Sequence, residues 1–208
     1  MRHVHVLAGI ASVGLVAASL VIGASASARD TINETGGNDH LQGTPSSDTI
    51  RGFGGKDRID ALAGADVIGG GSGQDDLSGG PGEDTIRGGN RFDYVTAGRG
   101  DDTIRGGTSF DSLNGQRGDD TLYGGAGRDD MAGVRGADVI FGGALADGLS
   151  DGPGTDTIYG GLGNDHVILV KDRTPDTVTC GSGHDLVYGA TNEDTIAADC
   201  EEVNPNQP

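Results

Sequence analysis

The chain is poor in the large side chains from which compact domains build a core. Tryptophan is absent, and phenylalanine and tyrosine contribute only four residues each to the 208. Glycine, by contrast, supplies 41 residues, well above its usual share of roughly 7%. This composition disfavours one compact core and favours stacked small units, each of which buries its apolar residue against its neighbours.

Positive charge is also scarce. Lysine and arginine together number 14, against 32 aspartates and glutamates, which gives a net charge of −18. Such a chain repels phosphate, so nucleic acid is excluded as a partner. The excess of carboxylates suits the binding of cations. An acidic disordered coil has the same composition, and we expect the metal-free chain to resemble one.

Few residues are available for zinc binding or catalysis. The histidines outside the first residues, His40, His166 and His184, are scattered, and no Cys/His cluster suits zinc. Neither H-E-x-x-H nor G-x-S-x-G occurs, and no stretch free of repeats is long enough for a catalytic domain. We therefore expect no enzymatic activity; the alternative, a solenoid enzyme, would need a wide groove with clustered acids and bases.

What the chain has in abundance is a nine-residue repeat. Residues 70–78 and 79–87 both read G-G-x-G-x-D-x-U-x, where U is a large apolar residue. Aspartate recurs at every ninth position from Asp30 to Asp165, and resumes at Asp176 after a two-residue insertion. Two residues beyond each aspartate stands Ile, Leu, Val or Met. Because strand side chains alternate, we expect U to point inward and its two neighbours outward.

This repeat resembles the RTX, or hemolysin-type, calcium-binding nonapeptide. The resemblance covers nearly all of the chain beyond residue 28 and implies an all-β fold, a parallel β-roll (β-solenoid) with two nonapeptides per 18-residue coil. Each nonapeptide would form a six-residue turn and a three-residue strand. In similar proteins, calcium ions lie between successive turns of one stack, held by aspartates of both turns and by backbone carbonyls of the glycine-rich segments.

We therefore expect several calcium ions, bound by two rows of aspartates. One row contains Asp39, Asp57, Asp75, Asp93, Asp111, Asp129, Asp147 and Asp165. The other row contains Asp48, Asp66, Asp84, Asp102, Asp120, Asp138 and Asp156. Calcium prefers six to eight oxygen ligands, whereas magnesium demands a tighter octahedron and keeps its waters. The alternative is that each aspartate only caps its own turn by hydrogen bonding.

The two rows differ at the fourth position of the turn. The second row keeps glycine there in Gly64, Gly82, Gly100, Gly118, Gly136 and Gly154, whereas the first row has Arg91, Ser109 and Leu145. If the turn needs a positive φ at this position, the larger residues are strained. We therefore expect weaker calcium binding around Asp93, Asp111 and Asp147.

The first 28 residues have the layout of a secretory signal peptide. A weakly basic start precedes the apolar stretch 6–23, and small residues end at Ala28, the expected cleavage site. An uncleaved membrane anchor is the alternative, because this stretch nearly spans a bilayer. RTX exoproteins typically lack such a leader, so we expect secretion through the general pathway.

The remaining chain divides into a calcium-binding roll, 29–170, and a C-terminal cap, 171–208. The two cysteines, Cys180 and Cys200, lie 20 residues apart, close to one coil, and in a secreted chain they predict a disulfide. The run from Thr177 to Glu201 resembles the cap of stand-alone secreted RTX-like proteins of actinobacteria.

One strand face is ordered enough to suggest either of two roles. Its ninth positions read Arg51, Gly69, Arg87, Arg105, Tyr123, Phe141 and Tyr159. Stacking of like on like would stabilise the sheet; alternatively, the face binds a polysaccharide, such as one of the cell envelope, or ice. We expect a monomer with a structural, envelope-associated or calcium-buffering role, and binding of a polysaccharide or ice is the alternative.

Overall fold

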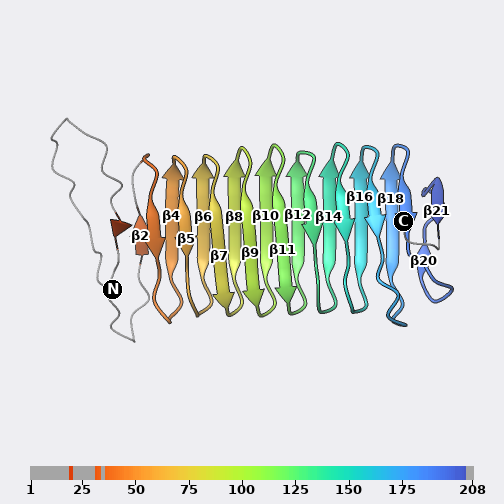
Figure 1. The fold of residues 1–208 in the computed structure, drawn as a ribbon, viewed down its shortest axis with the longest axis horizontal. Helices are drawn as coiled ribbons and strands as arrows, with labels where there is room; N and C mark the ends of the chain where they lie inside the picture. The colour runs from red at the N-terminus through yellow and green to blue at the C-terminus, as the bar shows by residue number, and fades with distance from the viewer. Residues whose placement is uncertain (1–18, 21–30, 34–35, 205–208) are drawn as a thin grey trace.

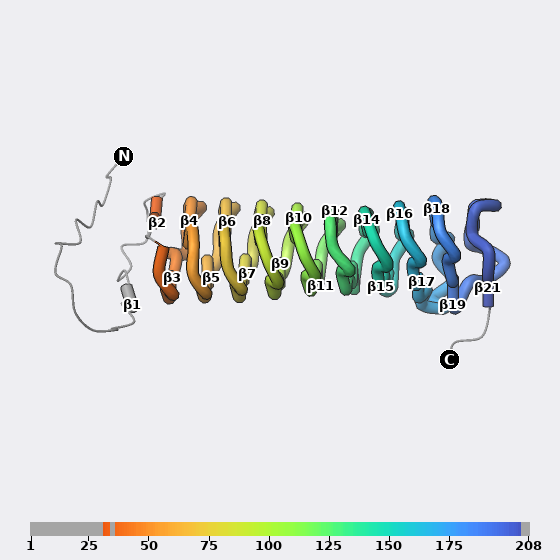
Figure 2. The backbone as a smooth tube through the Cα atoms, turned by 90° about the horizontal axis from the view of Figure 1, so that it is seen from above, coloured from red at the N-terminus to blue at the C-terminus, as the bar shows by residue number. Residues whose placement is uncertain are grey.

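The computed structural model describes residues 19–20, 31–33 and 36–204, and within these ranges all regular structure is strand. The chain winds in flat coils along one axis, so that strands of odd number form one parallel sheet and strands of even number form the other (Figures 1 and 2). The prediction of an all-β parallel β-roll is confirmed.

The two sheets are defined by the following strands. The first contains β1 (Ser19–Leu20), β3 (His40–Gln42), β5 (Arg58–Asp60), β7 (Asp76–Pro81), β9 (Tyr94–Arg99), β11 (Ser112–Arg117), β13 (Asp130–Ala132), β15 (Gly148–Ser150), β17 (His166–Ile168), β19 (Leu186–Tyr188) and β21 (Glu202–Asn204). The second contains β2 (Thr31–Asn33), β4 (Thr49–Gly54), β6 (Val67–Ser72), β8 (Thr85–Asn90), β10 (Thr103–Thr108), β12 (Thr121–Ala126), β14 (Val139–Ala144), β16 (Thr157–Leu162), β18 (Thr177–Ser182) and β20 (Thr195–Ile196).

The strand register follows the repeat. Ile104 pairs with Ile86 on one side and Leu122 on the other, each one 18-residue coil away. After the insertion, Ile158 pairs with Val178, so the extra residues lie in the turn and leave the sheet in register. Each position of the repeat therefore stacks on the same position of the next coil.

Many strands are longer than the three residues expected from sequence. In β10, the ladder passes from Arg105 over Gly106 and resumes at Gly107, so the strand continues into the following turn. Glycine at the corner lets adjacent coils stay close enough for their backbones to keep pairing. The three-residue prediction holds for shorter strands such as β5 and β13.

The apolar residue of each repeat forms the core. These side chains are almost completely buried from Ile32 to Val187, while Ile196 in the cap is only partly buried. Their neighbours in the strands are more exposed, as the alternation of the pattern predicts. The core is thus a double row of single side chains packed between two sheets.

At the N-terminal end, the two-residue strand β1 pairs with His40 and Leu41 of β3. Apart from β1, the predicted signal peptide lies outside the described residues. In the part of the chain that the structure describes, no helix is long and apolar enough to cross a membrane.

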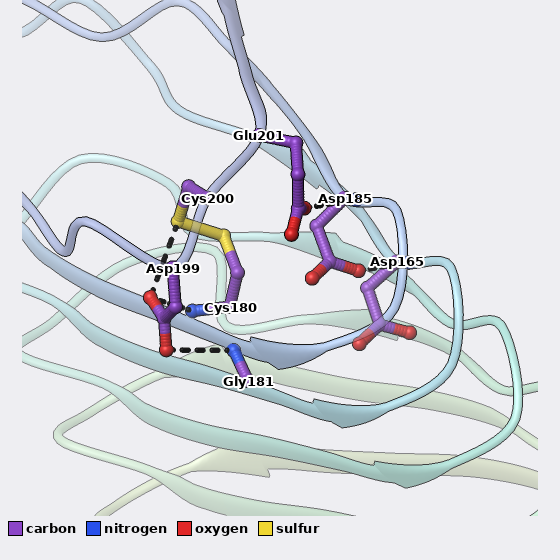
Figure 3. The surroundings of a disulfide bond; sticks show 7 residues. All are labelled: Asp165, Cys180, Gly181, Asp185, Asp199, Cys200 and Glu201. Atoms are coloured by element: carbon purple, nitrogen blue, oxygen red, sulfur yellow. Dashed lines mark hydrogen bonds between the residues drawn. A yellow bond between two sulfur atoms is a disulfide. The ribbon is translucent and has the colours of Figure 1, made fainter.

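At the C-terminal end, Cys180 of β18 forms a disulfide with Cys200 (Figure 3). The Asp199 carboxylate accepts hydrogen bonds from the backbone N–H groups of Cys180 and Gly181, at 3.3 and 3.1 Å. The predicted pairing of the two cysteines is therefore present, and it ties the last turn to the edge of the roll.

Candidate metal centre

The structure brings the predicted aspartates together in two rows, one along each side of the roll. Each aspartate stands directly before a strand, where the chain leaves the turn and enters the sheet. All of the predicted ligands are buried except Asp39, which is partly buried in the first coil. Buried carboxylates are rare unless they are paired or bind metal.

One oxygen of each carboxylate holds neighbouring coils together. The backbone N–H of Asp84, for example, donates to Oδ1 of Asp102 in the next coil, at 2.7 Å. The same bond recurs along both rows at 2.6–3.0 Å. A capping role for the aspartates is therefore present, but it runs between coils and uses only Oδ1.

The second oxygen, Oδ2, is buried and has no hydrogen-bond partner among the described residues. This is the case for Asp39, Asp57, Asp66, Asp75, Asp84, Asp93, Asp102, Asp111, Asp120, Asp129, Asp138, Asp147, Asp156, Asp165 and Asp185. A buried polar group without a partner is strongly destabilising, and a charged one more so. So regular a series of unpaired oxygens indicates a ligand that is itself a cation.

The surroundings of Oδ2 suit calcium. A Cβ added at Gly52 would lie 2.1 Å from Oδ2 of Asp57 and 2.9 Å from the carbonyl oxygen of Gly70 in the next coil. A side chain there would therefore fill the place where carboxylate and carbonyl oxygens approach one another. An all-oxygen donor set of this kind matches the preference of calcium, and the residues present fit the ion.

Ionisation of all the buried aspartates in a row would destabilise the metal-free fold. Burial raises the pKa of Asp111 to about 8, and repulsion from Asp93 and Asp129 adds to the effect, although the hydrogen bond from the Asp93 N–H opposes it. Burial likewise raises the pKa of Asp57 to about 6 and that of Asp102 to about 7. Protons or cations that bind to the rows therefore stabilise the fold by lowering this charge.

Asp48 differs from the other predicted ligands. Its Oδ2 accepts hydrogen bonds from the backbone N–H and the hydroxyl of Thr44, at 2.6 and 2.9 Å. At the other end of the same row, Oδ2 of Asp194 accepts the N–H of Thr191 at 2.6 Å. Threonines thus occupy this oxygen at both ends of the described part of the row, which makes Asp48 the weakest of the candidate ligands.

The rows extend into the cap, beyond the ligands predicted from the sequence. Asp176 and Asp185 accept the Asp156 and Asp165 N–H groups, both at 20-residue spacing. The resumed nine-residue step was the signal for both. Glu201 then takes the place of an aspartate and accepts the Asp185 N–H at 2.8 Å (Figure 3); no repeat signal marks it.

The fourth turn position has positive φ, as the sequence led us to expect. Most glycines there adopt φ of 117° to 157°, with Gly154 an exception, whereas Arg91, Ser109 and Leu145 adopt 76° to 81°. These three turns therefore follow a different backbone path, although Oδ2 of Asp93, Asp111 and Asp147 remains buried and unpaired. Weaker calcium binding there stays a prediction.

The second turn position also has positive φ, although the sequence shows no sign of it. Leu62 and Gln116 adopt 76° there, and Val134, a β-branched residue that strongly disfavours this region, adopts 87°. All three belong to the row whose fourth positions are glycine. Backbone strain is therefore distributed over both rows.

The raised pKa values predict that acid replaces calcium in folding. A carboxyl with a higher pKa in the fold than in the unfolded chain binds protons more tightly when folded. The metal-free fold is then most stable below about pH 4 and loses stability as the pH rises through about 6 to 8. Circular dichroism in chelator should show more β-structure at about pH 5 than at about pH 8. Equal spectra at both values would contradict the prediction.

Replacing Gly100 with leucine should remove roughly one strong calcium site. A Cβ at Gly100 would lie 2.0 Å from the carbonyl oxygen of Gly82, and a non-glycine residue in this region costs about 1–2 kcal/mol. Conversely, Leu145→Gly should gain affinity near Asp147. Calorimetric titration with calcium measures both changes.

The matched control for these variants is Gly69→Ala, because a Cβ at Gly69 meets nothing within 4 Å and its φ is not in the positive region. This variant should titrate like the unaltered protein. If Gly100→Leu does so as well, the fourth-position glycine does not determine calcium affinity.

Comparison with known families agrees with the geometry. The model of the RTX calcium-binding nonapeptide repeat (4 copies) matches residues 35–68, 69–90, 78–113, 96–131, 105–140 and 132–167. No curated protein matches the chain. The matched segments together cover residues 35–167 without interruption, which is more than half of the chain. They include nearly all of the aspartates described above. The chain therefore belongs to the family of RTX calcium-binding nonapeptide-repeat proteins.

Proposed function

We propose that this protein is secreted and folds as it binds several calcium ions between its stacked turns, and that its role is structural or envelope-associated rather than catalytic. The observation that carries this proposal is the series of buried, unpaired Oδ2 atoms along both rows. Calcium would satisfy these oxygens and, with them, complete the interior of the roll.

Electrostatics supports the coupling of folding to binding. Removal of residues 1–28 takes away Arg2 and no acidic residue, which changes the net charge from −18 to −19. Without cations, the rows place many carboxylates one coil apart, where like charges repel. Because the core offers one large apolar side chain per nonapeptide, apolar burial opposes this repulsion only weakly.

The proposed ligands are the aspartates of both rows from Asp39 to Asp165, with each ion shared by aspartates of successive coils. Asp57 with Asp75, and Asp66 with Asp84, are the strongest candidates, since the hydrogen-bond ladder is regular there and every Oδ2 is unpaired. Asp48 is the weakest, because Thr44 already satisfies its Oδ2.

The proposed domain division is a signal peptide (1–28), a calcium-binding roll (29–170) and a cap (171–208). The apolar leader supports export through the general secretory pathway, and a disulfide in the cap suits an oxidising compartment. Cleavage after Ala28 would remove β1 and leave β3 as the edge of its sheet.

Binding of a polysaccharide or ice by the ordered strand face has less support. Tyr123, Phe141 and Tyr159 stack with centroids 4.9 and 4.8 Å apart and interplanar angles of 4° and 5°. Arg105 lies 4.7 Å from the ring centre of Tyr123. The ring faces therefore cover one another, which favours stabilisation of the sheet over stacking on a sugar.

Calcium should drive folding at neutral pH. Circular dichroism of the purified protein is expected to show coil in chelator and β-structure when about millimolar calcium is added, a range typical of extracellular calcium modules. Magnesium at the same concentration is the control and should have a much smaller effect. A fully folded protein in chelator at neutral pH would refute the proposal.

The exported protein should lack residues 1–28 and contain the disulfide. Its intact mass without reduction is expected to match residues 29–208 less two hydrogen atoms, and reduction should add these back. A mass that includes the first 28 residues would favour the anchored form, and two free thiols would exclude the disulfide.

A further inference from the structure

Asp151 places a carboxylate where most other turns of its row have a small residue. It follows β15 and takes the first position of its nonapeptide, which is glycine in residues 79, 115 and 133. This position faces the interior, since a Cβ at Gly133 would lie 2.3 Å from Oδ2 of Asp138. Asp151 itself is completely buried.

Asp151 belongs to a cluster of three carboxylates. Asp156 comes from the same turn and Asp176 from the next, and one oxygen of each of the three lies within 4.8 Å of the others. All three residues are at most 2% exposed. Over the ranges that the structure describes, no other trio of acidic, histidine or cysteine side chains is placed in this way.

The hydrogen bonds around the cluster leave an oxygen for a cation. Asp151 accepts the Val170 N–H at 2.9 and 3.1 Å, and so reaches from its own turn to the next. Oδ1 of Asp156 accepts the Asp138 N–H at 2.7 Å, while its Oδ2 is buried and unpaired. Oδ1 of Asp176 accepts the Asp156 N–H at 2.9 Å.

The three carboxylates repel one another in the absence of a cation. One oxygen of each lies within 4.8 Å of the others, and all three residues are buried, so solvent does little to weaken the repulsion. The cluster therefore concentrates more negative charge than the two successive aspartates of an ordinary site.

We propose that Asp151, Asp156 and Asp176 bind one calcium ion together, more tightly than the sites formed by two aspartates of successive coils. Calcium affinity rises with the number of charged ligands and with the rigidity of the site. The inference deepens the proposed function, since it assumes that calcium enters the rows. It assigns a ligand, Asp151, that stands outside the repeated aspartate position.

The location gives this ion a particular role. Asp156 precedes β16 and Asp176 precedes β18, the strands between which the spacing changes from 18 to 20 residues. The two inserted residues lengthen the turn 169–176 between β17 and β18, towards the C-terminal end in Figure 1. An ion held by both turns would fasten this longer turn, and the cap beyond it, to the roll.

Calorimetric titration of calcium into the purified protein tests the assignment. Asp151→Asn removes the charge and keeps the shape of the side chain. The matched control, Asp130→Asn, removes the same charge from an exposed position of β13. The unaltered protein and the control should show one site tighter than the rest, and in Asp151→Asn its affinity should fall about tenfold or more.

A second variant covers the case in which Asp151→Asn does not fold. Asp151→Gly restores the residue found at position 133 and should keep the remaining calcium sites while losing the tight one. If either folded variant titrates like Asp130→Asn, the cluster is not a distinct calcium site, although the proposed function stands. If the unaltered protein takes up no calcium, the proposed function itself fails.

Discussion

The rest of the structure depends on how the buried aspartate carboxylate divides its two oxygens. Oδ1 accepts the backbone N–H of the aspartate one coil earlier, and in most coils Oδ2 is buried without a hydrogen-bond partner among the described residues. The two tasks support each other, because a cation at Oδ2 stabilises the ionised carboxylate, and an ionised carboxylate accepts the stronger hydrogen bond. Calcium thus acts on the register of the coils as well as on their charge.

The fold was predictable because a strict nine-residue repeat favours the stacking of equivalent positions in successive coils. Ile104 finds Ile86 and Leu122 as neighbours simply because they hold the same position in adjacent repeats. The length of the strands was not predictable. In β10, pairing continues beyond Arg105 because Gly107 meets Gly89 and Gly125 in adjacent coils, a relation that no single repeat contains.

The candidate site was predictable in its repeated part and not at its exceptions. The aspartates from Asp57 to Asp147 follow from the step alone. The different character of Asp48 depends on Thr44, and that of Asp156 depends on Asp151, both of which lie outside the aspartate position. The repeat gives only the residues common to most turns. It therefore does not predict an additional side chain that lies next to one particular carboxylate. The positive φ of Val134 was not predicted either. Glycine, which tolerates positive φ, occupies the second position in most coils, so the repeat does not show that this position requires it.

The unbroken register across the insertion makes the roll extensible in one dimension. The chain gains residues in the turn between Ile158 and Val178, yet the two residues still pair in the sheet. Because each coil pairs only with its neighbours, the number of coils is not fixed by the shape of one coil. Adding one 18-residue unit would lengthen the molecule by about 4.8 Å, the spacing of paired strands. Length and ion capacity would then grow together, while the end structures at Thr44 and at Cys200 stay unchanged. The length of a protein built in this way is set by the copy number of its repeat.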